Sequence, residues 1–139
     1  MSWVVWALLS AFFAGITAIL AKVGVEHVNS SLATAIRTTV ILVITWAVAF
    51  ASAGPVSMPG RRTLLFLALS GAATGLSWLC YFRALQLGEA SRVAPLDKLS
   101  VVFVIVLAGI FLRERLTWHQ AVGGGLIVAG SVILAWKSA

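Results

Sequence analysis

The chain has 139 residues, of which 61% are hydrophobic and only 10% are charged. Soluble domains carry about 25% charged residues, so this composition excludes an ordinary soluble domain as well as a disordered chain. The net charge of +6 comes from basic residues that stand singly or in pairs between apolar runs. They are interpreted as topology determinants and contacts to anionic lipids, and no nucleic-acid partner is expected.

Crossing a hydrocarbon core of about 30 Å takes about 20 residues of helix. The sequence predicts an all-α integral membrane protein in which residues 1–139 form a single transmembrane domain. Its five spans are expected at about residues 3–21, 32–53, 63–85, 95–112 and 118–136. The one linker-like segment lies between the second and third spans, where glycine–proline pairs at 54–55 and 59–60 break the helix.

The first two predicted spans each carry a polar stripe. Thr17 belongs to the stripe of the first span, and Thr34, Thr38 and Thr45 share a face of the second span with Arg37 beside them. An arginine at the centre of a span costs about 2.5–3.5 kcal/mol, and less near an end. Two interpretations of Arg37 stay open: its side chain snorkels to the lipid head groups, or it contacts a substrate or a carboxylate inside the bundle.

The third predicted span combines hydroxyl groups with two large rings. These side chains recur at spacings of three and four residues, which puts them on one helix face: Ser70, Thr74, Ser77, Trp78 and Tyr81. Such a stripe is either interhelical packing with local hydrogen bonds or the wall of a cavity.

The fourth predicted span begins with Pro95 at the first helical position, which helices favour. Asp97 then falls in the first turn, where a negative charge is stabilised by the helix dipole, and Lys98 follows it. The pair is either an interfacial aspartate with a snorkelling lysine, or a polar gate or coupling site at the mouth of a cavity.

Small residues line the fifth predicted span, which begins and ends with interfacial tryptophans. Ala121, Gly125 and Ala129 recur every four residues, and Gly123 and Gly130 stand seven apart. Faces of this kind let helix backbones approach closely, so this helix is expected to serve the interface between two copies of the chain.

Signatures of enzymes and of bound cofactors are missing from the sequence. No Cys/His cluster has metal-ligand spacing, no glycine-rich phosphate loop is present, and neither G-x-S-x-G nor H-E-x-x-H occurs. The sequence therefore predicts no catalytic residue, no metal site and no cofactor.

A family resemblance is carried by the second half of the chain. A helix end of the form YFRAL is followed by a short turn ending in proline and by an apolar helix closing in LRERLTWHQ. Gly123, Leu126, Ile127 and Gly130 then follow the spacing G-x-x-L-I-x-x-G. Together they resemble the second half of an EamA repeat, the unit of the drug/metabolite transporter superfamily. Familiar members carry a pair of repeats, whereas this chain is similar to the single-repeat, five-span bacterial and archaeal transporters.

The resemblance implies a secondary transporter in the cytoplasmic membrane of a prokaryote. Such a protein would move small polar or amphipathic metabolites by alternating access, through a site near the bilayer midplane. The alternative is a non-transporting membrane subunit that modulates or assembles another membrane complex. In the transporter interpretation Asp97 and Lys98 serve gating or coupling, and the substrate-binding residues are Trp78, Tyr81, Arg37, Ser77, Thr38 and Thr17.

The resemblance also implies an assembly of two copies into a ten-helix inverted-repeat bundle. Five spans put the termini on opposite sides of the membrane, and the basic residues divide almost evenly between those sides. The N-terminal side has Arg61, Arg62, Arg113 and Arg115. The other side has Lys22, Arg83, Arg92 and Lys137, with Arg37 and Lys98 just inside the membrane on that side. So weak a bias favours dual insertion and an antiparallel homodimer, with a parallel dimer as the alternative.

Overall fold

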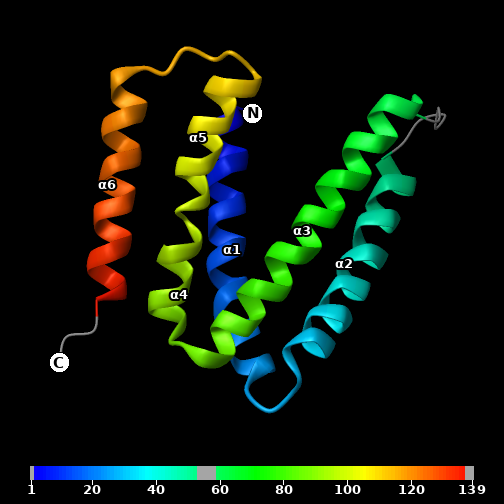
Figure 1. Ribbon diagram of the computed structural model, residues 1–139. Coiled ribbons are helices and arrows are strands. Elements are labelled where there is room, and N and C mark those ends of the chain that lie inside the picture. The colour runs from blue at the N-terminus through cyan, green and yellow to red at the C-terminus, as the bar shows by residue number, and fades with distance from the viewer. Residues whose placement is uncertain (1, 53–58, 137–139) are drawn as a thin grey trace. The chain divides into compact units, whose positions relative to one another are not determined.

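The protein is almost entirely helical in the computed structural model, which describes residues 2–52 and 59–136. The helices are α1 (Trp3–Val25), α2 (Ser30–Ser52), α3 (Arg61–Leu87), α4 (Ala90–Asp97), α5 (Ser100–Phe111) and α6 (Trp118–Ala135) (Figure 1). The described residues contain no strand. Five helical segments are long and apolar enough to cross a membrane, with α4 and α5 together forming one of them, Ala90–Phe111. The predicted all-α, five-span architecture is thereby confirmed.

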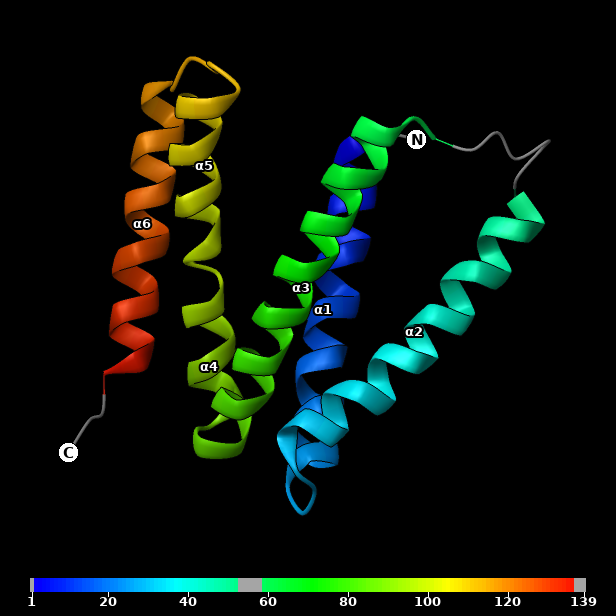
Figure 2. The same ribbon diagram turned by 45° about the vertical axis from the view of Figure 1, so that its right-hand side comes forward.

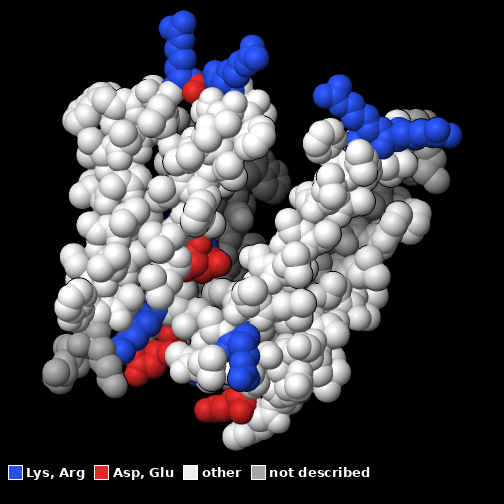
Figure 3. All heavy atoms as spheres, in the orientation of Figure 1, with Lys and Arg blue, Asp and Glu red and all other residues white. Residues whose placement is uncertain are grey.

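Most large apolar side chains of these helices are exposed on the surface of the chain. Figure 3 shows the Lys and Arg side chains gathered at the ends of the helices, with an almost uncharged surface between them. A soluble protein cannot present so much apolar area to water, whereas lipid tails cover it without cost. The chain is therefore a multi-pass membrane protein.

The first three helices are longer than the sequence predicts. α1 continues to Val25 and α3 runs from Arg61 to Leu87. Inside a membrane every backbone N–H must find an acceptor within the chain, so a helix continues until a turn residue or the polar interface stops it. The predicted end of the second span, Ala53, and the glycine–proline pair at 54–55 lie outside the described residues.

The chain divides into two compact units, residues 20–86 and residues 1–19 with 87–139. In the second of these, α6 packs along α4 and α5 in the opposite direction (Figure 1). The buried hydroxyl of Ser131 donates a 2.9 Å hydrogen bond to the carbonyl oxygen of Pro95. Gly124 is also buried, and a Cβ at this position would lie 3.5 Å from Cδ1 of Ile105. Small side chains on α6 therefore allow the close approach of the α4–α5 segment.

The unit of residues 20–86 is closed at one end, where the last turn of α1 meets α2 and α3. A small buried core lies there, made of Ala21, Val25, Thr34, Phe82 and Leu85. Figure 2 shows α2 and α3 near each other at this end and diverging towards their other ends.

Two side chains close this end of the unit by binding helix carbonyl groups. Lys22 Nζ donates to the carbonyl oxygen of Leu85 at 2.7 Å. Gln86 Nε2 donates to the carbonyl oxygens of Val25 at 3.1 Å and Val28 at 2.6 Å. The last carbonyls of a helix have no partner within it, so α1 and α3 each supply a side chain that satisfies the C-terminal end of the other.

The fourth span differs from its prediction. Pro95 does not begin a helix: it lies inside α4, which begins at Ala90 and ends at Asp97. The placement of Asp97 in a first helical turn was therefore wrong. Proline is favoured at the first helical position because its missing N–H costs no hydrogen bond there. In a membrane, however, the residues before Pro95 satisfy their own backbone groups by continuing the helix back to the turn.

The backbone between α4 and α5 tightens instead of leaving the helical path. The N–H groups of Lys98 and Leu99 donate to carbonyls three residues back, at 3.1 and 3.0 Å, and those of Val101 and Val102 do the same, both at 3.0 Å. Short stretches of this 3₁₀ geometry inside a helix often mark functional hinges. The span is thus a discontinuous helix with Asp97 and Lys98 at its break.

Candidate functional site

Arg37 of α2 stacks against two aromatic rings of α3. Its guanidinium carbon lies 4.4 Å from the ring centroid of Trp78 and 5.4 Å from that of Phe82. The pairing follows from helical spacing, because Trp78 and Phe82 are four residues apart and so project from one face. Thr34, three residues before Arg37, is buried in the core beside the same face of α2. The core therefore orients α2 so that Arg37 meets the two rings.

Three predicted site residues come together at this point. Trp78 contacts Arg37 directly, and Tyr81 interacts with it electrostatically. Sequence reasoning missed Phe82, whose spacing of four from Trp78 was the available signal. We call Arg37, Trp78, Tyr81 and Phe82 the arginine–aromatic cluster.

The ring of Trp78 lies closer to the guanidinium carbon of Arg37 than the ring of Phe82, which is one turn nearer the Leu87 end of α3. Both interpretations of Arg37, snorkelling to the head groups and a role inside the bundle, stay predictions.

The hydroxyl groups of the predicted polar stripes bond within their own helices. Thr38 Oγ1 donates to the carbonyl oxygen of Thr34 at 2.8 Å, and Thr45 and Thr74 make the same kind of bond at 2.8 and 2.9 Å. Such a bond satisfies the hydroxyl wherever the side chain points. The threonine stripes therefore do not by themselves require a cavity. Ser77 is exposed on α3, and Thr17 is half-buried on α1 in the other unit.

Asp97 and Lys98 lie at the break between α4 and α5, where Asp97 Oδ2 is 3.6 Å from Lys98 Nζ. Asp97 is the last of the eight residues of α4 and so lies about 10 Å along a span of 22 residues. The earlier helix start thus places this carboxylate further from the start of the spanning helix than the sequence predicts. Ionisable groups inside a span are rare and commonly functional.

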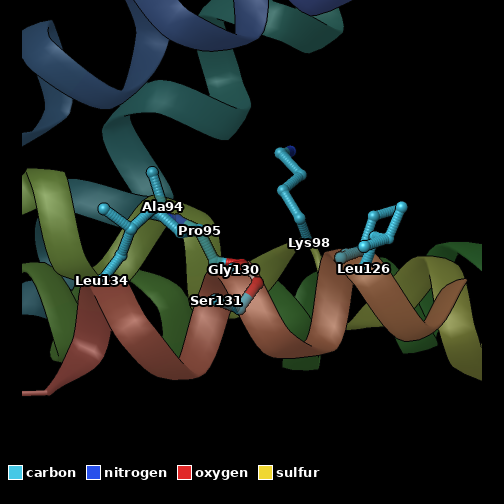
Figure 4. A pocket seen from close by; sticks show the side chains of 8 residues that line it. Ala94, Pro95, Lys98, Leu126, Gly130, Ser131 and Leu134 are labelled. Carbon is cyan, nitrogen blue, oxygen red and sulfur yellow. Dashed lines mark hydrogen bonds between the residues drawn. The ribbon is translucent and has the colours of Figure 1, made fainter. Parts of the chain in front are cut away.

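A shallow groove of about 430 Å³ lies between α4 and α6. Its wall is apolar apart from Lys98 and Ser131, and Figure 4 shows the Lys98 amine extending away from the ribbon of α6. Lys98 is the predicted site residue that lines it. Within the described residues, no group of three or more His, Cys, Asp or Glu side chains could hold a metal ion.

Comparison with known proteins shows what the chain is similar to. A family model described as "EamA-like transporter family" matches residues 1–136. A Sinorhizobium protein named "Uncharacterized transporter in cobO 3'region" is 56% identical over 96% of this chain and 96% of its own length. A "Probable terminal-alkyne amino-acid exporter" of Streptantibioticus cattleyicolor is 34% identical over 97% of this chain, which spans only 46% of that protein.

A smaller relative is named as part of a flippase. The "Probable 4-amino-4-deoxy-L-arabinose-phosphoundecaprenol flippase subunit ArnF" of Erwinia tasmaniensis is 40% identical over 58% of this chain and 64% of its own length. No solved structure matches the chain.

Proposed function

The chain belongs to the EamA-like transporter family, and from this premise we propose that it moves small polar or amphipathic metabolites across the cytoplasmic membrane by alternating access. The family and the transporter names of the relatives support a transporter in general rather than an enzyme. Substrate class and mechanism are the parts that we propose.

The observation that carries the proposal is the arginine–aromatic cluster. A charged group and three aromatic side chains converge from α2 and α3 within segments otherwise suited to lipid. Binding sites for small molecules commonly combine aromatic walls with a few polar groups that fix orientation. In this site Trp78 and Tyr81 supply the wall, Arg37 supplies the charge, and Ser77 and Thr38 are proposed contributors. Thr17, on α1 in the other unit, stays a separate proposal.

Replacing Trp78 with alanine is expected to reduce transport about 2- to 30-fold, because the cation–π contact between Arg37 and the half-buried Trp78 ring is worth about 0.5–2 kcal/mol. The measurement is efflux from proteoliposomes loaded with the twenty amino acids, glucose and glycerol 3-phosphate, followed by mass spectrometry. Trp46→Ala is the matched control, since Trp46 is exposed on α2 and stacks on Phe50 at 5.3 Å.

Two outcomes of this assay would count against the proposal. Equal efflux by the Trp78→Ala and wild-type proteins would remove the cluster from the transport path. Efflux no faster than from protein-free liposomes would favour the non-transporting subunit.

We further propose that two oppositely inserted copies complete the transporter. The chain spans about half of the exporter that it resembles, which supports assembly from two repeats. Four basic residues are expected outside the spans on each side, with Arg37 and Lys98 just inside the membrane on one side, and so weak a bias supports insertion in both orientations.

Reporters that are active only in the cytoplasm, fused separately before Met1 and after Ala139, are expected to give signal from both termini. A membrane protein of known single orientation, fused to the same reporters, checks the assay. Only its cytoplasmic terminus should give signal. A clean signal from one terminus alone would rule out dual insertion and leave the parallel dimer.

A further inference from the structure

Among the described residues of the unit 20–86, no ion pair joins Arg37 to an acidic side chain. The ion pairs found among the described residues lie elsewhere, between Arg92 and Glu89 and between Lys98 and Asp97. Charged side chains inside a membrane generally pair with another charge or face a polar path, because an isolated charge there is costly. Among the described residues of its own unit, the cluster therefore holds a positive charge that no ion pair balances.

Stacking leaves the hydrogen-bonding groups of Arg37 in a defined place. The rings of Trp78 and Phe82 lie 4.4 and 5.4 Å from its guanidinium carbon, so both are within cation–π distance of the group. The N–H groups of a guanidinium lie in its plane and form a fork that matches the two oxygens of a carboxylate or a phosphate. The contacts with the two rings thus hold a group of this shape in place on the face of α2 that meets α3.

The rings are themselves held in place. Phe82 is only 3% exposed and Leu85 is fully buried, in the core where α1, α2 and α3 meet. The hydrogen bonds from Lys22 and Gln86 fasten the end of α3 to the α1–α2 turn. A site whose supporting residues are locked by packing and hydrogen bonds loses little entropy when it binds a ligand.

We propose that Arg37, stacked on Trp78 and Phe82, is a binding site for an oxyanion, either a carboxylate or a phosphate. The inference rests on the proposed function, in which this oxyanion is a group of the transported molecule. The same chemistry is offered by a soluble metabolite and by the head group of an anionic lipid, and the experiment separates these sources.

The test is isothermal titration calorimetry on the full chain in dodecyl maltoside, a detergent without phosphate or carboxylate. The soluble probes are succinate and glycerol 3-phosphate, and the lipid probe is dioctanoyl phosphatidic acid. Arg37→Gln is expected to weaken binding of at least one probe roughly 10- to 100-fold, as loss of charge-assisted hydrogen bonds requires. Arg37→Lys is expected to fall between, because lysine keeps the charge and loses the fork.

Arg62→Gln is the matched control. Arg62 also stands over an aromatic ring of α3, 6.0 Å from the centroid of Phe66, but at the start of that helix. Its replacement is expected to leave binding within about twofold of wild type. Circular dichroism and monodisperse elution show whether each variant keeps its helical fold.

The outcomes separate this inference from the proposed function. If Arg37→Gln weakens binding of succinate or glycerol 3-phosphate, the ligand is a soluble metabolite. If it weakens binding of phosphatidic acid alone, the ligand is a lipid head group. Binding that is unaffected by Arg37→Gln, or absent from the wild-type protein for all three probes, overturns the oxyanion site. If the protein transports but its probe binding does not depend on Arg37, the oxyanion site fails and the proposed function stands. If binding depends on Arg37 but the protein does not transport, the oxyanion site stands and the proposed function fails.

Discussion

Asp97→Asn is expected to insert and assemble normally but to lower transport about 5- to 150-fold, the range of coupling free energies between linked sites. The carboxylate lies within a membrane span, at the break between α4 and α5, with the Lys98 ammonium 3.6 Å away. Transporters commonly bind coupling ions where a spanning helix is discontinuous.

The control for Asp97 is Glu89→Gln. Glu89 precedes α4 at its N-terminal end, outside the span, and pairs with Arg92 at 3.0 Å while remaining exposed. Surface ion pairs of this kind contribute little, so this variant should transport within about twofold of wild type. An unchanged rate in Asp97→Asn would show that Asp97 and Lys98 are interfacial residues without a part in transport.

Gly124→Leu is expected to lower the free energy of unfolding by about 1–3 kcal/mol, the usual cost of overpacking a core. Gly124 is buried in α6, and a Cβ there would already lie 3.5 Å from Cδ1 of Ile105. That distance is an ordinary contact, so Gly124→Ala should be tolerated. The further carbons of leucine have no space unless α6 separates from α5.

Gly125→Leu is the matched control for this substitution. Nothing lies within 4 Å of a Cβ built at Gly125, so the protomer should unfold as the wild type does. Unfolding is measured by titration with sodium dodecyl sulfate, followed by circular dichroism. Equal destabilisation by both substitutions would contradict the packing of α6 described above. A lower dimer content in Gly125→Leu alone would agree with an interface between copies on that face.

The number and type of the spans could be predicted from the sequence because hydropathy over about 20 residues is a local property. The boundaries depended on weaker signals. Proline at the start of a helix is a preference, and the membrane's demand for satisfied backbone groups overrode it at Pro95. The position of Asp97 within its helix followed from that boundary, so the sequence alone placed this carboxylate in a first helical turn instead of at the end of α4.

The candidate site was predictable only in part. Spacing along α3 put Trp78 and Tyr81 near one another, since the period of a helix is known without its partners. The position of Arg37 relative to these rings could not be predicted in this way. It depends on how α2 packs against α3, around the buried core of Val25, Thr34 and Leu85.

Composition and periodicity thus determined that this chain is a five-span helical membrane protein, and its motifs indicated the family. Only the tertiary structure decided that Phe82 joins Trp78 over Arg37, that Thr38 bonds to its own helix, and that Asp97 stands at a helix break. The physical reason is that a helix specifies its own faces through short-range geometry, whereas the choice of partner face depends on packing between segments distant in sequence.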